Sequence, residues 1–159
     1  MAQHGVRAGC AKSGAPLNFT LGVTMKPISD LETLLKSMHP ELNPGTFAFA
    51  TLPPGQLVSM TDVVALIQEP EGTSVVVNET DLIRLGLSAV FICAWITLTV
   101  NSDLQAVGLT AAFSAALGSA GISCNVVAGT NHDHIFVPVS QAAAAMNALH
   151  ALQERAAAE

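Results

Sequence analysis

The stretch from Trp95 to Leu109, WITLTVNSDLQAVGL, changes its pattern halfway along. Its first part is rich in β-branched residues, which favour a strand. The triplet Asn101-Ser102-Asp103 then supplies side chains that can cap a helix. Apolar residues recur at helical spacing beyond the triplet, at Leu104, Val107, Ala111 and Ala115. The stretch therefore predicts a strand, a tight turn and a helix that begins at the turn.

The chain after this helix adds a hairpin and a second helix. Gly121 ends the first helix, and a strand is expected over residues 122–128. A turn at residues 129–131 leads to a returning strand at 134–139, and a final helix begins at Ser140. Strand, helix, hairpin and helix make up most of a split β-α-β unit. The fourth strand of this unit has no assignment, and it comes either from the first half of the chain or from a partner subunit.

The first half of the chain has a similar but less regular order. A short amphipathic helix is expected over residues 29–38, and a strand over residues 45–52. Residues 62–68 and 73–77 are predicted to form a hairpin, because Glu69-Pro70-Glu71-Gly72 between them suits a type I turn. A short helix that Gly86 ends should follow.

One apolar run, from Ala89 to Val100, is long for a single strand. We expect it to close one unit, to bend near Cys93 and to open the next unit. The order of elements then predicts an α+β fold with two ferredoxin-like βαββαβ units, antiparallel sheets and helices on one face. We place the first unit at residues 25–92 and the second at residues 93–159.

Residues 1–24 are expected to form a disordered N-terminal extension. Pro16, Asn18 and Thr20 interrupt the apolar stretch that a secretory signal requires. The stretch from Leu104 to Ala128 has the length of a membrane span, but it carries several polar residues and has no basic cluster beside it. We therefore expect no membrane partner.

Charge and cysteine content exclude further classes of protein. The formal net charge is -6 and the six Lys and Arg residues are scattered, which argues against binding to nucleic acid. Cys10, Cys93 and Cys124 lack CxxC spacing and are odd in number. Reduced thiols of this kind are typical of a cytoplasmic protein.

Three segments carry a resemblance to a known family: Trp95–Leu109, AGISCNVVA at Ala120–Ala128, and HDHIFV at His132–Val137. On these segments the chain resembles ACT domains, and in particular bacterial proteins that carry two ACT-like units in tandem. The similarity extends over residues 28–152. It implies a regulatory or sensor protein that forms homo-oligomers and binds a small ligand, in the first place an amino acid, at a groove between units or between subunits.

The resemblance places the ligand beside the turn from the first strand to the first helix. Backbone N–H groups at a helix N-terminus suit a ligand carboxylate, and Asp103 suits an α-ammonium group. The same residues also fit a second interpretation, in which polar side chains only cap the helix and Gly108 only allows close packing. In this sequence the turn comprises Asn101, Ser102, Asp103, Leu104, Val107 and Gly108.

Two further residues are candidates for the ligand groove. Asn125 points to the opposite face of its strand from Cys124, where it either reaches the groove or faces solvent. His132 belongs to the cluster His132-Asp133-His134, in which both imidazoles project on one side of an extended chain. Zinc takes three or four protein ligands, and the sequence brings no third one to His132 and His134. We therefore favour hydrogen bonding of His132 within the turn or the ligand groove.

Two alternatives to a sensor follow from these residues. One is a metal-dependent enzyme that uses His132, Asp133 and His134, and the other is a dimerisation module without a ligand. The sequence contains no nucleophile elbow, no glycine-rich phosphate loop and no recognisable pair of catalytic acids. We therefore expect neither catalytic residues nor a cofactor.

Overall fold

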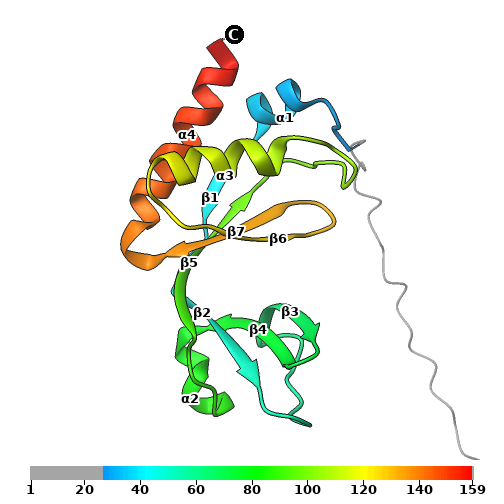
Figure 1. Ribbon diagram of the computed structural model, residues 1–159, viewed down its shortest axis with the longest axis vertical. Helices are drawn as coiled ribbons and strands as arrows, with labels where there is room; N and C mark the ends of the chain where they lie inside the picture. Colours follow the sequence, from blue (N-terminus) through cyan, green and yellow to red (C-terminus); the bar gives the residue numbers. More distant parts are fainter. Residues whose placement is uncertain (1–26, 159) are drawn as a thin grey trace, which may run out of the picture.

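A computed structural model describes residues 27–158 of the chain. The predicted extension at residues 1–24 lies outside the described residues. Within them the chain forms a seven-stranded antiparallel sheet and four α-helices (Figure 1). The strands are β1 (Pro40–Leu42), β2 (Phe47–Leu52), β3 (Val63–Glu69), β4 (Gly72–Asn78), β5 (Phe91–Leu98), β6 (Asn125–Ala128) and β7 (Asp133–Pro138). The helices are α1 (Leu31–Ser37), α2 (Leu82–Leu85), α3 (Leu109–Ser119) and α4 (Ala142–Ala158).

Strand β5 belongs to both units. Its first residues, Phe91–Cys93, pair with β2, whereas Cys93–Leu98 pair with β7. Cys93 therefore lies opposite Phe47 on one side and Pro138 on the other. Figure 1 shows β5 running from one half of the molecule into the other. The expectation that one long run closes the first unit and opens the second near Cys93 is confirmed.

Strand β1 supplies the fourth strand of the second unit. Pro40–Leu42 pair antiparallel with Ile96–Leu98, so the second unit has the strand order β1-β5-β7-β6. The missing strand thus comes from the first half of the chain. It escaped the sequence analysis because three residues beginning with proline show no alternation. The predicted boundary between residues 92 and 93 falls inside β5, and α1 and β1 pack with the second unit although they precede it.

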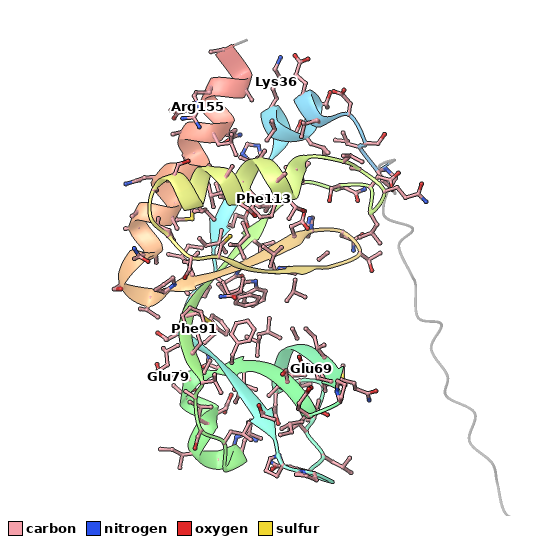
Figure 2. The ribbon with its side chains drawn as sticks, viewed as in Figure 1. Lys36, Glu69, Glu79, Phe91, Phe113 and Arg155 are labelled. Carbon is pink, nitrogen blue, oxygen red and sulfur yellow. The ribbon has the colours of Figure 1, made fainter. Side chains whose placement is uncertain are left out.

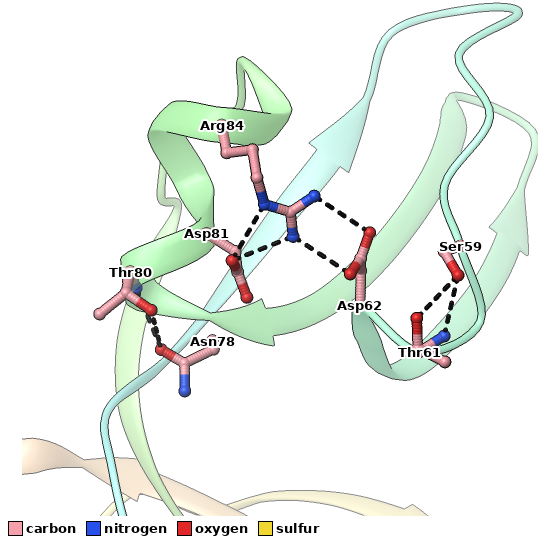
Figure 3. A network of polar contacts seen from close by, with 7 residues as sticks. All are labelled: Ser59, Thr61, Asp62, Asn78, Thr80, Asp81 and Arg84. Carbon is pink, nitrogen blue, oxygen red and sulfur yellow. Dashed lines mark hydrogen bonds and ion pairs between the residues drawn. The ribbon is translucent and has the colours of Figure 1, made fainter.

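The first unit is a reduced version of the same arrangement. Its strand order is β5-β2-β4-β3, and α2 follows β4. The loop at residues 53–62 forms turns where the second unit has helix α3. Arg84 of α2 joins this loop, because its Nη2 lies 3.1 Å from Oδ1 of Asp62 and 3.0 Å from Oδ1 of Asp81 (Figure 3).

The main core lies between the second unit's sheet and its helices. Strand residues on one face, such as Ile96 and Ile135, meet Phe113 of α3 and Leu149 of α4. Figure 2 shows Phe113 on the side of α3 that faces the sheet. Leu34 of α1 joins the same core, and all five side chains are fully buried. Helices α1, α3 and α4 therefore cover one face of the sheet.

None of the described helices is long and apolar enough to cross a membrane.

The opposite face carries a cluster of aromatic side chains that joins the two units. The ring centroids of Phe49 and Phe136 lie 5.3 Å apart and those of Phe47 and Trp95 lie 5.2 Å apart, both with edge-to-face geometry. Trp95 also stacks on Phe136 at 6.3 Å. We call Phe47, Phe49, Phe91, Trp95 and Phe136 the aromatic cluster. It ties β2 of the first unit to β7 of the second.

We expect Gly108→Ala to destabilise the contact between α1 and the second unit. Gly108 has φ +109°, and a Cβ atom there would lie 2.8 Å from Cδ2 of Leu31. Both strain and overlap should lower the free energy of unfolding by about 1–3 kcal/mol in chemical denaturation. Gly118→Ala is the matched control, because its added methyl meets no atom within 4 Å, and it should be neutral or stabilising. Equal effects of the two variants would contradict the packing.

Candidate functional site

The turn between β5 and α3 is held extended by the segment before α1. The backbone N–H of Ile28 donates to the carbonyl of Asn101 at 2.9 Å, and the N–H of Asp103 donates to the carbonyl of Ile28 at 2.8 Å. The carboxylate of Asp103 accepts a hydrogen bond from the N–H of Gln105 at 2.9 Å. These bonds keep the triplet Asn101-Ser102-Asp103 out of the helix.

The predicted start of helix α3 is therefore wrong. The helix begins at Leu109, and its N-cap is Gly108 in the left-handed region rather than a residue of the triplet. Leu104 and Val107, expected on the helix, lie in the turn and are 68% and 84% exposed. Ala111 and Ala115, the other two predicted apolar positions, lie on α3 but are exposed. The buried face of the helix is instead formed by Leu109, Phe113 and Leu117.

A small pocket of about 80 Å³ lies between this turn, the start of α3 and the hairpin of β6 and β7. We call it the turn pocket. Its volume is well below the roughly 300–1,000 Å³ of typical drug-sized sites, so it suits a small ligand or one polar head group. Its lining residues are Ser102, Asp103, Leu104, Ala106, Leu109, Thr110, Ala128 and Asp133.

The N-terminus of α3 opens at this pocket without a cap. The N-cap residue Gly108 has no side chain that could accept a hydrogen bond from the first turn of the helix, and the first backbone bond runs from the N–H of Ala112 to the carbonyl of Gly108 at 2.9 Å. The preceding N–H groups have no partner four residues earlier within the helix. Leu109 and Thr110 of this turn line the pocket, so the helix offers donors and a positive dipole end to an anionic group.

Asp133 supplies the opposite charge to the pocket. It is only 7% exposed and lies on the face of β7 that also carries the core residues Ile135 and Val137. Burial raises the pKa of Asp133, whereas His134, a hydrogen bond from Ser102 and His132 act in the opposite direction. The Lys and Arg side chains that form ion pairs among residues 27–158 are Lys36 and Arg84, and their partners are other carboxylates, so Asp133 forms an ion pair with no Lys or Arg of this range.

The structure brings together part of the predicted ligand set. Ser102, Asp103 and Leu104 line the turn pocket. Asn101 lies just before them and accepts a backbone bond from Ile28, while Gly108 caps α3 next to Leu31. Val107 points away to solvent.

Asn125 and His132 do not line the pocket. Asn125 pairs with Phe136 across β6 and β7, at the other end of the hairpin from Ala128 and Asp133. His132 lies in the preceding turn, with Nδ1 3.3 Å from the carbonyl oxygen of Val100. Either residue could therefore contact a ligand only if the ligand extended beyond the turn pocket.

Asp133 was missed as a pocket residue, although the sequence carried a signal for it. The alternation of β7 puts Asp133 on the same side as Ile135 and Val137, and a carboxylate on a buried face is unusual. Thr110 and Ala128 were missed because only the folded chain brings the helix and the hairpin together.

His132 and His134 contact groups outside the turn pocket, unlike Asp133. Nδ1 of His134 lies 3.1 Å from Nε1 of Trp95 on the face opposite the helices. Among the described residues no three His, Cys, Asp or Glu side chains are grouped so that they could hold a metal ion. The geometry gives the metal-dependent enzyme no supporting observation.

Comparison with known proteins gives two matches to family models, each described as an ACT domain. One matches residues 26–94 and the other matches residues 90–151. The two ranges overlap at the start of β5, where the structure shows one strand shared by both units. The search of curated proteins gave no match.

Several solved structures are similar to this chain. VC0802 from Vibrio cholerae, a protein of unknown function described as a possible transport protein, is 41% identical, with a TM-score of 0.65 over 77% of this chain and 95% of that chain. Atu0741 from Agobacterium tumefaciens is 15% identical, with a TM-score of 0.60 over 73% and 89% of the two chains. The regulatory subunit of aspartate kinase from Thermus thermophilus is 14% identical, with a TM-score of 0.52 over 72% and 97%.

We expect Asp133→Asn to stabilise the ligand-free protein at neutral pH. The pKa of Asp133 in the folded chain lies above its ordinary value of 3.8, so the ionised carboxylate costs stability as the pH rises from about that value through the folded pKa. An Asn side chain of the same shape avoids this cost and still accepts from Ser102.

Thermal unfolding of both proteins across pH 3 to 8 checks this expectation. The variant should unfold at a higher temperature than the wild type at pH 7, and the difference should be smallest at the acid end of the range, where the wild-type carboxyl is mostly protonated in both states. A difference that grows as the pH falls would contradict the burial argument.

Proposed function

The chain belongs to the ACT-domain family, as two units in tandem, and on that premise we propose that it is a regulatory or sensor protein that binds a small α-amino acid in the turn pocket. The chain then performs no catalysis of its own and requires no cofactor. Ligand binding stabilises one arrangement of its units or subunits, and this requires that the ligand bind that arrangement more tightly than the others.

One observation carries this proposal: the turn pocket is lined both by the first turn of α3, a positive dipole end, and by the buried carboxylate of Asp133. The uncapped N-terminus of α3 suits an α-carboxylate. The buried carboxylate of Asp133 suits an α-ammonium group, which would supply the positive charge that no Lys or Arg of residues 27–158 provides. Leu109, Ala106 and Ala128 leave room for a small side chain between them.

The position of the pocket favours a groove between subunits over one between units. The first unit joins β5 at Phe91–Cys93, whereas Asp133 pairs with Leu98 at the far end of the strand. Leu98 lies five residue steps along the strand from Cys93, a distance of about 17 Å. Leu104 and Val107 beside the pocket are exposed, and a second copy of the chain could cover them in a homo-oligomer.

Two further observations fit this role. The fold is shared with the regulatory subunit of aspartate kinase from Thermus thermophilus, which supports a regulatory function. Cys93 and Cys124 are free thiols, which fits a protein of the reducing cytoplasm.

The test is isothermal titration of the full chain with each standard α-amino acid at pH 8. We expect selective binding of one or a few amino acids with small side chains. Asp133→Asn should weaken that binding at least tenfold, since a buried charge pair lost on one side costs roughly 2–5 kcal/mol. The matched control is Asn125→Ala on the opposite face, which should leave binding unchanged.

Two results would contradict the proposal. Binding that survives Asp133→Asn but fails in Asn125→Ala would move the ligand to the other face of the sheet. Absence of binding by every amino acid would favour a dimerisation module without a ligand.

A further inference from the structure

His134 accepts hydrogen bonds on a single ring nitrogen. Its Nδ1 lies 3.1 Å from Nε1 of Trp95 and 3.3 Å from Oγ1 of Thr97. An indole N–H can only donate, so Nδ1 of His134 must be the acceptor. The ring proton of the neutral imidazole is therefore on Nε2, and the geometry describes the uncharged form of His134.

The hydroxyl of Thr97 is oriented by a third residue. Asn43, just beyond β1, donates from Nδ2 to Oγ1 of Thr97 at 2.9 Å, and its backbone N–H donates to the carbonyl of Trp95 at 2.8 Å. Thr97 thus accepts from Asn43 and has its own proton left for His134. A second proton on His134 would occupy Nδ1, and its N–H would then face the N–H of Trp95. One of these two donors would have to leave.

Few charged groups of residues 27–158 lie near His134. Asp133 precedes it on β7, and His132 lies in the turn before the strand. On β1, Glu41 pairs with Thr97, which in turn pairs with His134, so Glu41 lies two strands away. The neighbour on β6 is the apolar Val127. Burial lowers the pKa of His134, His132 lowers it further, and Asp133 raises it.

His134 is also adjacent to the turn pocket through the backbone of β7. Successive strand residues point to opposite faces, so Asp133 reaches the pocket while His134 reaches Trp95. The charges of the two side chains nevertheless interact, since each affects the pKa of the other. A proton on His134 would offset part of the negative charge that an ammonium group needs at Asp133.

From this geometry we infer that His134 and Trp95 form a proton-operated switch, in which protonation of His134 breaks its hydrogen bond to Trp95 and weakens the binding of an amino acid at Asp133. The second part rests on the proposed function, whereas the first part does not. Linkage makes the effect reciprocal, so a ligand at Asp133 makes His134 harder to protonate.

The ligand-free protein tests the first part. Trp95 is the single tryptophan of the chain, so its emission reports on His134 directly, because an imidazolium quenches a neighbouring indole. Between pH 8 and pH 5 the wild-type emission should fall with a midpoint below 6.5, the ordinary pKa of His134. His134→Gln keeps an acceptor that does not titrate, and its emission should stay constant.

His150→Gln is the matched control, since His150 is exposed on α4, and its titration should match the wild type. Far-ultraviolet circular dichroism at each pH separates this change from unfolding. A constant wild-type emission, or the same titration in His134→Gln, would overturn the switch.

The second part is tested with glycine as the probe, by titration calorimetry at pH 8 and pH 5.5. The Kd of the wild type should rise at least about fivefold more than that of His134→Gln, the lower end of typical coupling between sites. The variant retains Asp133, so the comparison removes the effect of Asp133's own protonation. An equal rise in both proteins would overturn the coupling. If glycine does not bind at either pH, both the coupling and the proposed ligand are contradicted. The pH titration of Trp95 emission would still test whether protonation of His134 breaks its hydrogen bond to Trp95.

Discussion

The hydrogen-bond ladders that β5 forms with β2 and with β7 join the two units of this molecule. Each ladder uses a different part of the strand: Phe91–Cys93 join β2 and Cys93–Leu98 join β7. Neither unit can complete its sheet without β5, so the units cannot separate without breaking backbone pairs. The side chain of Cys93 reinforces the crossing point, because it is fully buried and donates to the carbonyl of Phe47 at 3.4 Å. Its pKa is raised to about 11 by burial, which keeps it a thiol.

Both functional features follow from the alternation of β7 beside this shared strand. Asp133 points toward the helices and closes the turn pocket, while His134 points to the other face and meets Trp95. Phe136, two residues further on, contacts Phe49 of the first unit. One strand therefore carries the pocket carboxylate, the histidine and a contact between the units. A ligand that moves β7 would therefore move side chains on both faces of the sheet.

The sequence predicted the elements with strong periodicity and failed where tertiary contacts decide. The change of units near Cys93 and the strand from Asp133 to Pro138 were predicted from their β-branched and aromatic residues. The start of α3 could not be predicted, because Ile28, from a distant part of the chain, forms backbone hydrogen bonds with Asn101 and Asp103 and keeps these residues out of the helix. β1 was missed for the same reason, since three residues become a strand only when β5 lies beside them. The turn pocket shows both outcomes. Ser102 and Asp103 were predicted as ligand residues because they lie in the turn after the strand, whereas Asp133 becomes a pocket residue only because its face of β7 is buried.

The central claim is that a zwitterionic amino acid lies between the N-terminus of α3 and Asp133. Nuclear magnetic resonance of the isotopically labelled chain, titrated with a bound amino acid, tests it most directly. The account predicts that the largest shifts occur at the backbone amides of Leu109, Thr110 and Ala111 and at the carboxyl carbon of Asp133. Shifts confined to the aromatic cluster or to the first unit, with these atoms unchanged, would contradict it.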